Sequence, residues 1–280
     1  MYATRPSRTA QMVCLFRAAE NLRPADRQIV ADPFAAGFLP LPMRVLSSAR
    51  ARLPDPTGLS TYVLARHAAL DDQVRRSVRG GCSRVVVLGA GYDSRAWRLA
   101  DVLGDTPVWE VDHPATAAAK AARAASLPPV NRRVVTVDFQ TQSLAEQLAA
   151  AGFTRGKSTC WIWEGVSMYL TRQAVLDSLG VMRELSGPGS VVGMDLWHYL
   201  DDPAMLSTAR RMSASMLALF GEPITFGVHP SDAVDFFARA GFELAHALDA
   251  SLLEQRFVPD GRHVMPECYV VGLTLSGGAT

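Results

Sequence analysis

The middle of the chain alternates between short apolar runs rich in β-branched residues and longer segments whose apolar residues recur every three or four positions. Runs of the first kind predict buried strands, and segments of the second kind predict helices. We expect strands at 84–88, 108–111, 133–137, 159–163 and 191–196, and helices at 115–125, 144–151 and 173–185. Strands and helices that alternate through short loops predict a mostly parallel sheet covered by helices on both faces.

The two ends of the chain follow other patterns. Residues 9–79 have helical periodicity, interrupted by a proline-rich stretch at 40–56 that predicts a loop or a short helix. After the fifth strand a helical, methionine-rich segment predicts an inserted cap. We expect Ser231 to cap a helix that ends at Gly241. Two apolar strands, 242–248 and 268–275, are expected to form an antiparallel hairpin with no helix between them.

These patterns divide one α/β domain into four parts. The expected parts are a helical N-terminal extension at 1–80, a core at 81–196, an inserted cap at 197–230, and a terminal helix and hairpin at 231–280.

Composition limits the classes of partner. The 280 residues carry 28 basic and 27 acidic side chains, a net charge of +1, which disfavours nucleic acid and anionic membranes as main partners. The chain has neither a signal-peptide pattern nor an apolar run near the roughly 20 residues of a membrane span. Its four cysteines lie far apart, which argues against disulfides and structural zinc. We therefore expect a cytoplasmic protein that binds small molecules.

The turn after the first predicted strand is the first candidate binding site. Gly89 and Gly91 allow a ligand to approach the backbone closely, and Glu110 and Asp112 end the next strand, where carboxylates accept hydrogen bonds from a ribose. An ordinary strand–turn–helix with surface acids would show the same pattern. Ser94 stands where a pyrophosphate fingerprint needs its third glycine, and acidic residues disfavour a diphosphate. S-adenosylmethionine, which is cationic and carries no phosphate, suits the turn better.

Several ordered motifs then resemble one family. Residues 86–99, VVLGAGYDSRAWRL, closely resemble the glycine-loop signature of the leucine carboxyl methyltransferase family, which includes protein phosphatase methyltransferases and polyketide O-methyltransferases. Further similar segments are 17–20, 32–35, 110–114 with Lys120, 137–139 and 164–171. The resemblance covers about residues 9–200. It implies a class I Rossmann-like methyltransferase fold with a mostly parallel seven-stranded sheet.

By position, the resemblance assigns parts of the donor to individual side chains. Arg66 matches the clamp on the methionine carboxylate, because a planar guanidinium binds a carboxylate through two hydrogen bonds. Asp112 matches the ribose ligand, Glu164 faces the donor's amino group, and Asp138 with Phe139 frames the adenine. The residues expected to contact the donor are Arg66, Gly89, Ala90, Gly91, Asp93, Asp112, His113, Asp138, Phe139 and Glu164.

Other charged residues near these motifs are expected to have structural roles. Glu110 is expected to be a supporting acid or a solvated strand end. We expect Arg95 and Arg98 to be structural, pairing with Asp93 or Asp101. His67 stands where many members of the family have threonine.

The acceptor decides whether catalysis needs a base. A carboxylate with a pKa near ~4 is already ionised at neutral pH, whereas a phenol near ~10 is not. His198, which follows the fifth strand, is the candidate base, with Tyr169 as a second candidate catalytic residue that packing alone would also explain. The spacing of the histidines does not indicate a metal site.

The resemblance implies an S-adenosylmethionine-dependent O-methyltransferase. An arginine-rich, lysine-poor composition is typical of high-GC bacteria and favours, by analogy, a polyketide-like carboxylate or phenol of secondary metabolism as acceptor. The alternatives are a protein C-terminal carboxyl methyltransferase, a nicotinamide-dependent oxidoreductase, and a donor-binding protein without catalysis.

Overall fold

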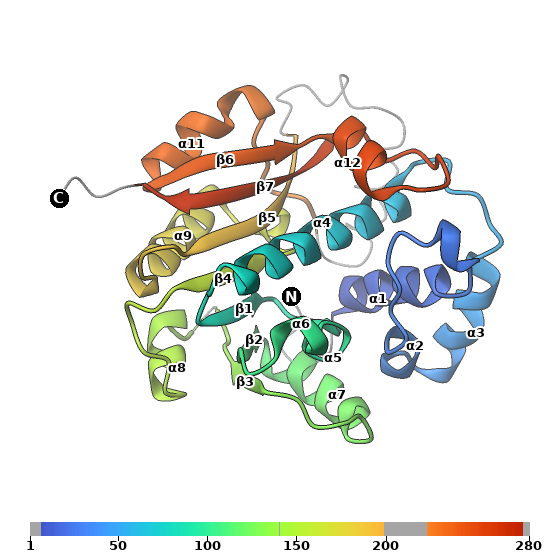
Figure 1. Cartoon of the computed structure of the whole chain (residues 1–280), viewed down its shortest axis with the longest axis horizontal. Coiled ribbons are helices and arrows are strands. Elements are labelled where there is room, and N and C mark those ends of the chain that lie inside the picture. Colours follow the sequence, from blue (N-terminus) through green and yellow to red (C-terminus); the bar gives the residue numbers. More distant parts are fainter. Residues whose placement is uncertain (1–6, 140, 199–222, 277–280) are drawn as a thin grey trace.

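A seven-stranded sheet organises the chain, as the computed structural model shows for residues 7–139, 141–198 and 223–276 (Figure 1). The strand order is β3-β2-β1-β4-β5-β7-β6. The first five strands run parallel, and β7 is antiparallel to both of its neighbours. The strands are β1 (Arg84–Leu88), β2 (Val108–Asp112), β3 (Arg132–Thr136), β4 (Thr159–Trp163), β5 (Val191–Trp197), β6 (Phe242–Leu248) and β7 (Cys268–Leu275). The predicted mostly parallel sheet with an antiparallel terminal pair is confirmed.

The parallel register brings the carboxyl ends of the central strands to one edge of the sheet. Leu88 at the end of β1 pairs with Val111 on one side and with Trp163 on the other. Trp163 in turn pairs with Met194, so β5 extends three residues further. Loops that follow parallel strands at this edge are the usual place for a ligand in an open α/β sheet.

The connection between the two terminal strands differs from the prediction. Helix α12 (Ala250–Phe257) follows β6 almost directly, so the expectation that no helix separates these strands is wrong. Asp249 caps the helix by accepting a hydrogen bond from the backbone N–H of Leu252 at 2.9 Å. This cap and the buried Leu253 are the local signals that identify the helix.

Within the described residues, four α-helices precede the sheet: α1 (Arg8–Glu20), α2 (Ala35–Phe38), α3 (Leu41–Arg50) and α4 (Leu59–Arg79). The stretch at 40–56 therefore contains a helix of ten residues, because Pro40 and Pro42 stand at the N-cap and in the first turn, where the missing N–H costs nothing, and the other two prolines follow the helix. The long helix α4 packs across β4, β5 and β7 and beside α12 (Figure 1).

The remaining helices of the described part are α5 (Arg95–Arg98), α6 (Ala100–Leu103), α7 (Pro114–Ala124), α8 (Leu144–Ala150), α9 (Arg172–Leu185) and α11 (Ala233–Arg239). Ser231 does not cap α11. It lies in the single 3₁₀ turn before it, and the side chain of His229 caps that turn. Most of the expected cap, residues 199–222, lies outside the described residues.

Two apolar layers cover the two faces of the sheet. Alternation along β5 sends Met194 and Leu196 into the layer shared with α9 and α11, whereas Trp197 joins the layer shared with α1 and α4. All four cysteines are buried free thiols, and burial raises the pKa of Cys14 to about 11. Within the described residues, no helix is long and apolar enough to cross a membrane.

Candidate functional site

The turn after β1 approaches the turn after β4 very closely. Gly89 and Gly91 both adopt positive φ angles, +65° and +48°, which glycine reaches without strain. A Cβ atom on Gly89 would lie 2.3 Å from Cγ2 of Val166, and one on Gly91 would lie 3.1 Å from Cβ of Ala10 in α1. The buried Ala90 lies between them. Glycine is therefore needed here both for the backbone conformation and for the space.

Asp112 joins this turn to the end of β2. Its Oδ2 accepts a hydrogen bond from the N–H of Gly91, and its Oδ1 accepts one from the N–H of His113 at 2.6 Å. Burial raises the pKa of Asp112 above its ordinary value, although both backbone bonds favour the charged form. His113 has a structural task as well, because its Nδ1 caps α7 by accepting from the N–H of Ala115 at 3.2 Å.

The expected adenine pair follows β3 at the same edge of the sheet. The N–H of Val137 donates to the carbonyl of Asp112 at 2.9 Å, which places Asp138 next to the end of β2. The N–H of Asp138 donates to the side-chain oxygen of Gln142 at 3.0 Å, and the ring of Phe139 is 53% exposed. An exposed aromatic ring two residues after Val137 offers a flat apolar face to a base.

Glu110 is neither solvated nor turned toward this edge. It is buried, and its Oε2 lies 2.7 Å from Nζ of Lys120 and 2.9 Å from a guanidinium nitrogen of Arg132. These contacts fit the supporting role and exclude the solvated one.

Two segments of the N-terminal extension meet at the glycine turn. Arg17 in α1 donates to Asp32 Oδ2 at 2.7 Å, to the carbonyl of Tyr92 at 2.6 Å and to Ser94 Oγ at 3.2 Å. Ser94 Oγ also donates to Asp32 at 2.6 Å. The motif segments 17–20 and 32–35 are thus held together by one buried ion pair that also anchors the turn.

Arg66 points from α4 to the ends of two strands. Its Nε lies 3.1 Å from Glu164 Oε1, just after β4, and its Nη1 lies 2.8 Å from Asp195 Oδ2 in β5. Burial lowers the pKa of Arg66, but the two carboxylates outweigh it and raise that pKa above its ordinary value. Arg66 and Glu164, predicted to bind opposite ends of an amino acid, are therefore in direct contact.

Arg95 occupies the centre of a second group of charges. Its Nη2 lies 2.7 Å from Glu164 Oε2, its Nε lies 2.7 Å from Asp71 Oδ1, and its Nη1 pairs with Asp93. Burial would raise the pKa of Glu164, but its contacts with His67, Arg95 and Arg66 hold it well below its ordinary range. Glu164 is therefore ionised at neutral pH.

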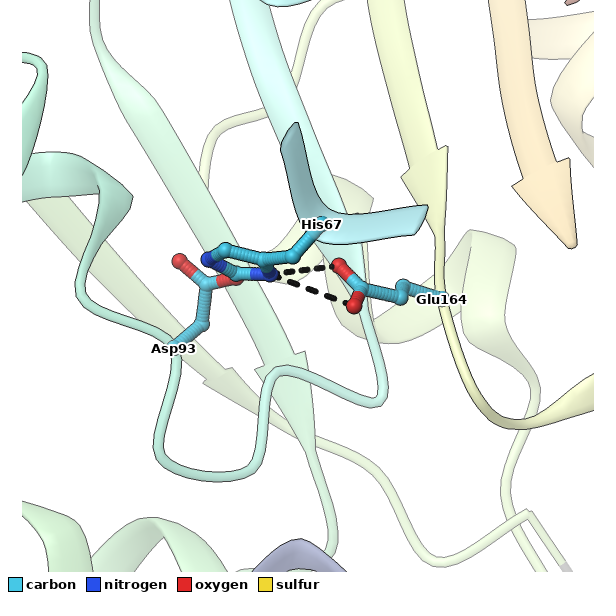
Figure 2. A group of neighbouring side chains, drawn as sticks. All are labelled: His67, Asp93 and Glu164. Atoms are coloured by element: carbon cyan, nitrogen blue, oxygen red, sulfur yellow. Dashed lines mark hydrogen bonds and ion pairs between the residues drawn. The ribbon is translucent and has the colours of Figure 1, made fainter. Parts of the chain in front are cut away.

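His67, Asp93 and Glu164 form the one group in the described residues whose ligand atoms converge as for a metal ion (Figure 2). The guanidinium of Arg95 contacts all three: Asp93 through Nη1, and Glu164 and His67 Nδ1 through Nη2. A permanently charged guanidinium at that position neutralises the carboxylates and opposes a second cation. This arrangement favours an ion-pair cluster over a metal site.

Charged groups surround the ring nitrogens of His67. Nη2 of Arg98 lies 2.8 Å from Nε2 and Nη2 of Arg95 lies 3.0 Å from Nδ1, so a guanidinium, which only donates, faces each ring nitrogen. Nδ1 also lies 3.0 Å from Glu164 Oε2. Burial, assisted by Arg95, lowers the pKa of His67. His67 is therefore neutral at physiological pH and connects Arg98 to Glu164.

Arg98 completes this cluster through Asp71, not through the predicted Asp101. It makes two contacts to the carboxylate of Asp71, one of them at 2.9 Å. Asp71 stands one helical turn after His67 on α4, so one face of α4 carries both groups.

The cluster as a whole carries a net negative charge. Three guanidinium groups face four carboxylates, and the neutral His67 adds no charge. The members are Arg66, Arg95, Arg98, Asp71, Asp93, Glu164 and Asp195. Within this group, carboxylates therefore outnumber guanidinium groups by one.

The two candidate catalytic residues lie at different places near this edge. Tyr169 ends a 3₁₀ turn after β4 and is partly buried against the layer shared with α1 and α4. The ring of His198 lies 5.4 Å from that of Tyr269 and 5.6 Å from that of His229. Because side chains alternate along β5, His198 continues the face of Leu196, whereas Asp195 reaches Arg66 on the other face.

Asp195 and Asp71 are the residues that sequence reasoning missed. Asp195 interrupts the apolar run of β5, and a carboxylate in a buried strand needs a partner of opposite charge. That interruption was the available signal. The partner could not be identified from the sequence, because Arg66 lies 129 positions away.

Sequence comparison relates this chain to known methyltransferases. The sequence profile described as leucine carboxyl methyltransferase matches residues 10–182. A Streptomyces coelicolor protein, provisionally named an S-adenosyl-L-methionine-dependent methyltransferase, is 34% identical over 76% of this chain and 75% of its own length. A Mycobacterium marinum protein with the same provisional name is 30% identical over 87% of this chain and 84% of its own length.

Solved structures confirm the fold. The crystal structure of a provisionally named methyltransferase from Thermobifida fusca superposes with a TM-score of 0.60 over 98% of this chain and 96% of that one, at 18% identity. The pyocyanin biosynthetic protein PhzM superposes with a TM-score of 0.51 over 87% of this chain and 62% of that one, at 13% identity. The resemblance in the motifs and the expected class I methyltransferase fold are thereby confirmed.

Proposed function

The chain belongs to the leucine carboxyl methyltransferase family of S-adenosylmethionine-dependent enzymes, and from that premise we propose that it methylates an oxygen of a small or medium apolar acceptor. The acceptor is a natural-product carboxylate or phenol of the polyketide type. The product is a methyl ester or a methyl ether.

One observation carries the proposal: the strand ends hold a net negative cluster in which Arg66 and Glu164 face one another. A donor with an ammonium, a carboxylate and a sulfonium has one net positive charge and suits this cluster. A dinucleotide would bring its pyrophosphate to a turn where Asp93 and Asp112 are the nearest acids. The charges therefore favour a phosphate-free donor over a nicotinamide cofactor.

Each part of the donor has a candidate partner in this chain. Arg66 binds the carboxylate, Glu164 the ammonium, Asp112 the ribose hydroxyls, and Asp138 with Phe139 the adenine. Two backbone hydrogen bonds hold the carboxylate of Asp112 in place, and Glu164 is ionised. Both side chains can therefore accept hydrogen bonds from the donor. The glycine turn lets the backbone approach the donor closely.

When bound, S-adenosylmethionine supplies a methyl group that its sulfonium already activates. The leaving group is the neutral thioether of S-adenosylhomocysteine. The protein then has to align the two reactants and exclude water, and good positioning removes roughly 7–11 kcal/mol of a barrier. A carboxylate acceptor needs nothing further, because it is ionised at neutral pH. For a phenol, His198 takes the phenolic proton, and Tyr169 forms part of the wall.

The test has two stages. Titration calorimetry of the protein with S-adenosylhomocysteine and with NAD should show binding of the first and much weaker binding of the second. Incubation with methyl-labelled S-adenosylmethionine and a panel of apolar carboxylic acids and phenols should then label a small-molecule fraction.

Each alternative has its own outcome. Preference for NAD would contradict the donor assignment. Label found only on the C-terminal carboxylates of proteins would replace the acceptor by a protein, and donor binding without any labelled acceptor would favour a non-catalytic role.

A further inference from the structure

A buried carboxylate outside the expected donor contacts lies behind Arg66. Asp195 in β5 is fully buried, and both of its oxygens are engaged. Oδ2 accepts from Arg66 Nη1 at 2.8 Å and from the hydroxyl of Tyr62 at 3.2 Å, and Oδ1 accepts from the N–H of Gly165 at 2.6 Å. Asp195 thus connects α4 to the turn that follows β4.

We propose that Asp195 is a positioning residue that fixes the guanidinium of Arg66 for the carboxylate of the donor's amino-acid tail. This inference rests on the proposed function. Arg66 has two carboxylate partners, Glu164 and Asp195. When Glu164 turns to the donor's ammonium, Asp195 remains as the partner that holds Arg66 in place.

The guanidinium of Arg66 packs against the turn after β4. Gly165 adopts a φ of +70°, and a Cβ atom there would lie 3.2 Å from Nη2 of Arg66. The absence of a side chain lets the guanidinium lie against the backbone whose N–H Asp195 binds. The carboxylate of Asp195 therefore binds both the guanidinium of Arg66 and the backbone turn at Gly165 against which that guanidinium packs.

Tyr62 supports the same arrangement from α4, one helical turn before Arg66. Burial and the nearby Asp195 raise the pKa of Tyr62 well above its ordinary value, so its hydroxyl stays protonated and donates to Asp195. The guanidinium carbon of Arg66 lies 5.5 Å from the centre of the Tyr62 ring. The hydroxyl orients the carboxylate, and the ring bounds the guanidinium on one side.

The experiment compares two ligands that differ in the amino-acid tail. S-adenosylhomocysteine carries it and 5′-methylthioadenosine lacks it, while both carry the adenine and the ribose. In Asp195→Asn the dissociation constant of S-adenosylhomocysteine should rise about tenfold or more, and that of 5′-methylthioadenosine by less than about twofold. Tyr62→Phe removes one hydrogen bond from Asp195 and should weaken only the first ligand, by about threefold.

A matched control removes a different buried acid that pairs with arginine. Glu20 is buried and accepts from both terminal nitrogens of Arg262, at 2.6 Å and 2.8 Å. Glu20→Gln should leave both dissociation constants near those of the wild type. Thermal unfolding of each variant shows which of them are folded at the temperature of the titration.

The outcomes distinguish a failure of the positioning role of Asp195 from a failure of donor binding itself. Equal losses for both ligands in Asp195→Asn, or no loss for either, would overturn the positioning role. If Asp195→Asn does not fold, Tyr62→Phe decides: an unchanged ratio of the two dissociation constants overturns the proposal. If the wild-type protein binds neither ligand, the proposed function fails first and this inference fails with it.

Discussion

Arg66 Nε and Glu164 Oε1 lie 3.1 Å apart, although the two residues are 98 positions apart in the sequence. The two side chains form a buried ion pair that joins α4, a helix of the N-terminal extension, to the residue just after β4. The amino-acid end of S-adenosylmethionine is a zwitterion, with the charges available to bind each partner separately. Donor binding then exchanges one ion pair for two, with little change in the charge that is buried.

The first prediction concerns Arg66→Lys. Lysine keeps the charge but cannot form the two parallel hydrogen bonds of a guanidinium. We expect calorimetry to show affinity for S-adenosylhomocysteine reduced about tenfold or more. Arg262→Lys makes the same exchange at the pair with Glu20 and should leave affinity unchanged. An unaltered dissociation constant in Arg66→Lys would show that the carboxylate clamp lies elsewhere.

The second prediction concerns Gly89→Ala. The positive φ costs an alanine about 1–2 kcal/mol, and its Cβ would meet Val166 at 2.3 Å. In a double-mutant cycle with Val166→Ala, the double variant should be more stable than the sum of the two single losses predicts, by about 1 kcal/mol. Urea unfolding measures all four proteins, and simple additivity would refute the close approach of the two turns.

The third prediction concerns the pH dependence of stability. Burial lowers the pKa of His67, so the unfolded chain binds a proton near pH 6.5 that the folded chain does not. The stabilisation is complete above pH 6.5 and is lost as the pH falls toward the folded pKa, with a slope of at most about 1.4 kcal/mol per pH unit. His67→Gln keeps a donor and an acceptor without the titration.

We therefore expect the free energy of unfolding to fall less steeply between pH 7 and pH 5 in His67→Gln than in the wild type. The buried acids Asp71 and Glu164 have lowered pKa values, so the stability that they contribute is lost at lower pH, below this window. Equal slopes in the two proteins would mean that His67 titrates alike in the folded and unfolded states.

The fourth prediction uses His198→Ala to identify the acceptor. A positioned base contributes about 10²–10⁴-fold, so kcat should fall by about 100-fold or more with a phenol and change little with a carboxylate. His229→Ala, which removes the neighbouring ring, serves as the control. A phenol-methylating enzyme that tolerates His198→Ala would exclude His198 as the base.

The sheet could be predicted because each strand carries its own local signal. The β-branched run of β1 and the apolar runs of β6 and β7 predict those strands with the bounds that the structure shows. Helix α3 was ambiguous because Pro40 and Pro42 stand at its N-cap and in its first turn, where they are compatible with a helix. Helix α12 was missed because a polar loop with strong turn residues follows it before β7.

The site was only partly predictable. Motifs at the strand ends indicated Gly89, Asp112 and Glu164, because the carboxyl ends of parallel strands meet at one edge. Asp195 and Asp71 escaped detection because their partners, Arg66 and Arg95, come from distant segments. Such pairings depend on how α4 crosses the sheet, and no local pattern specifies that crossing.

The most direct test of the donor assignment is a crystal structure of the protein with S-adenosylhomocysteine. We expect the ligand at the carboxyl ends of β1, β2 and β4, with Asp112 within hydrogen-bond distance of the ribose hydroxyls and Arg66 within that distance of the carboxylate. A ligand bound elsewhere, or crystals in which Asp112 and Arg66 point away from an empty cleft, would contradict it.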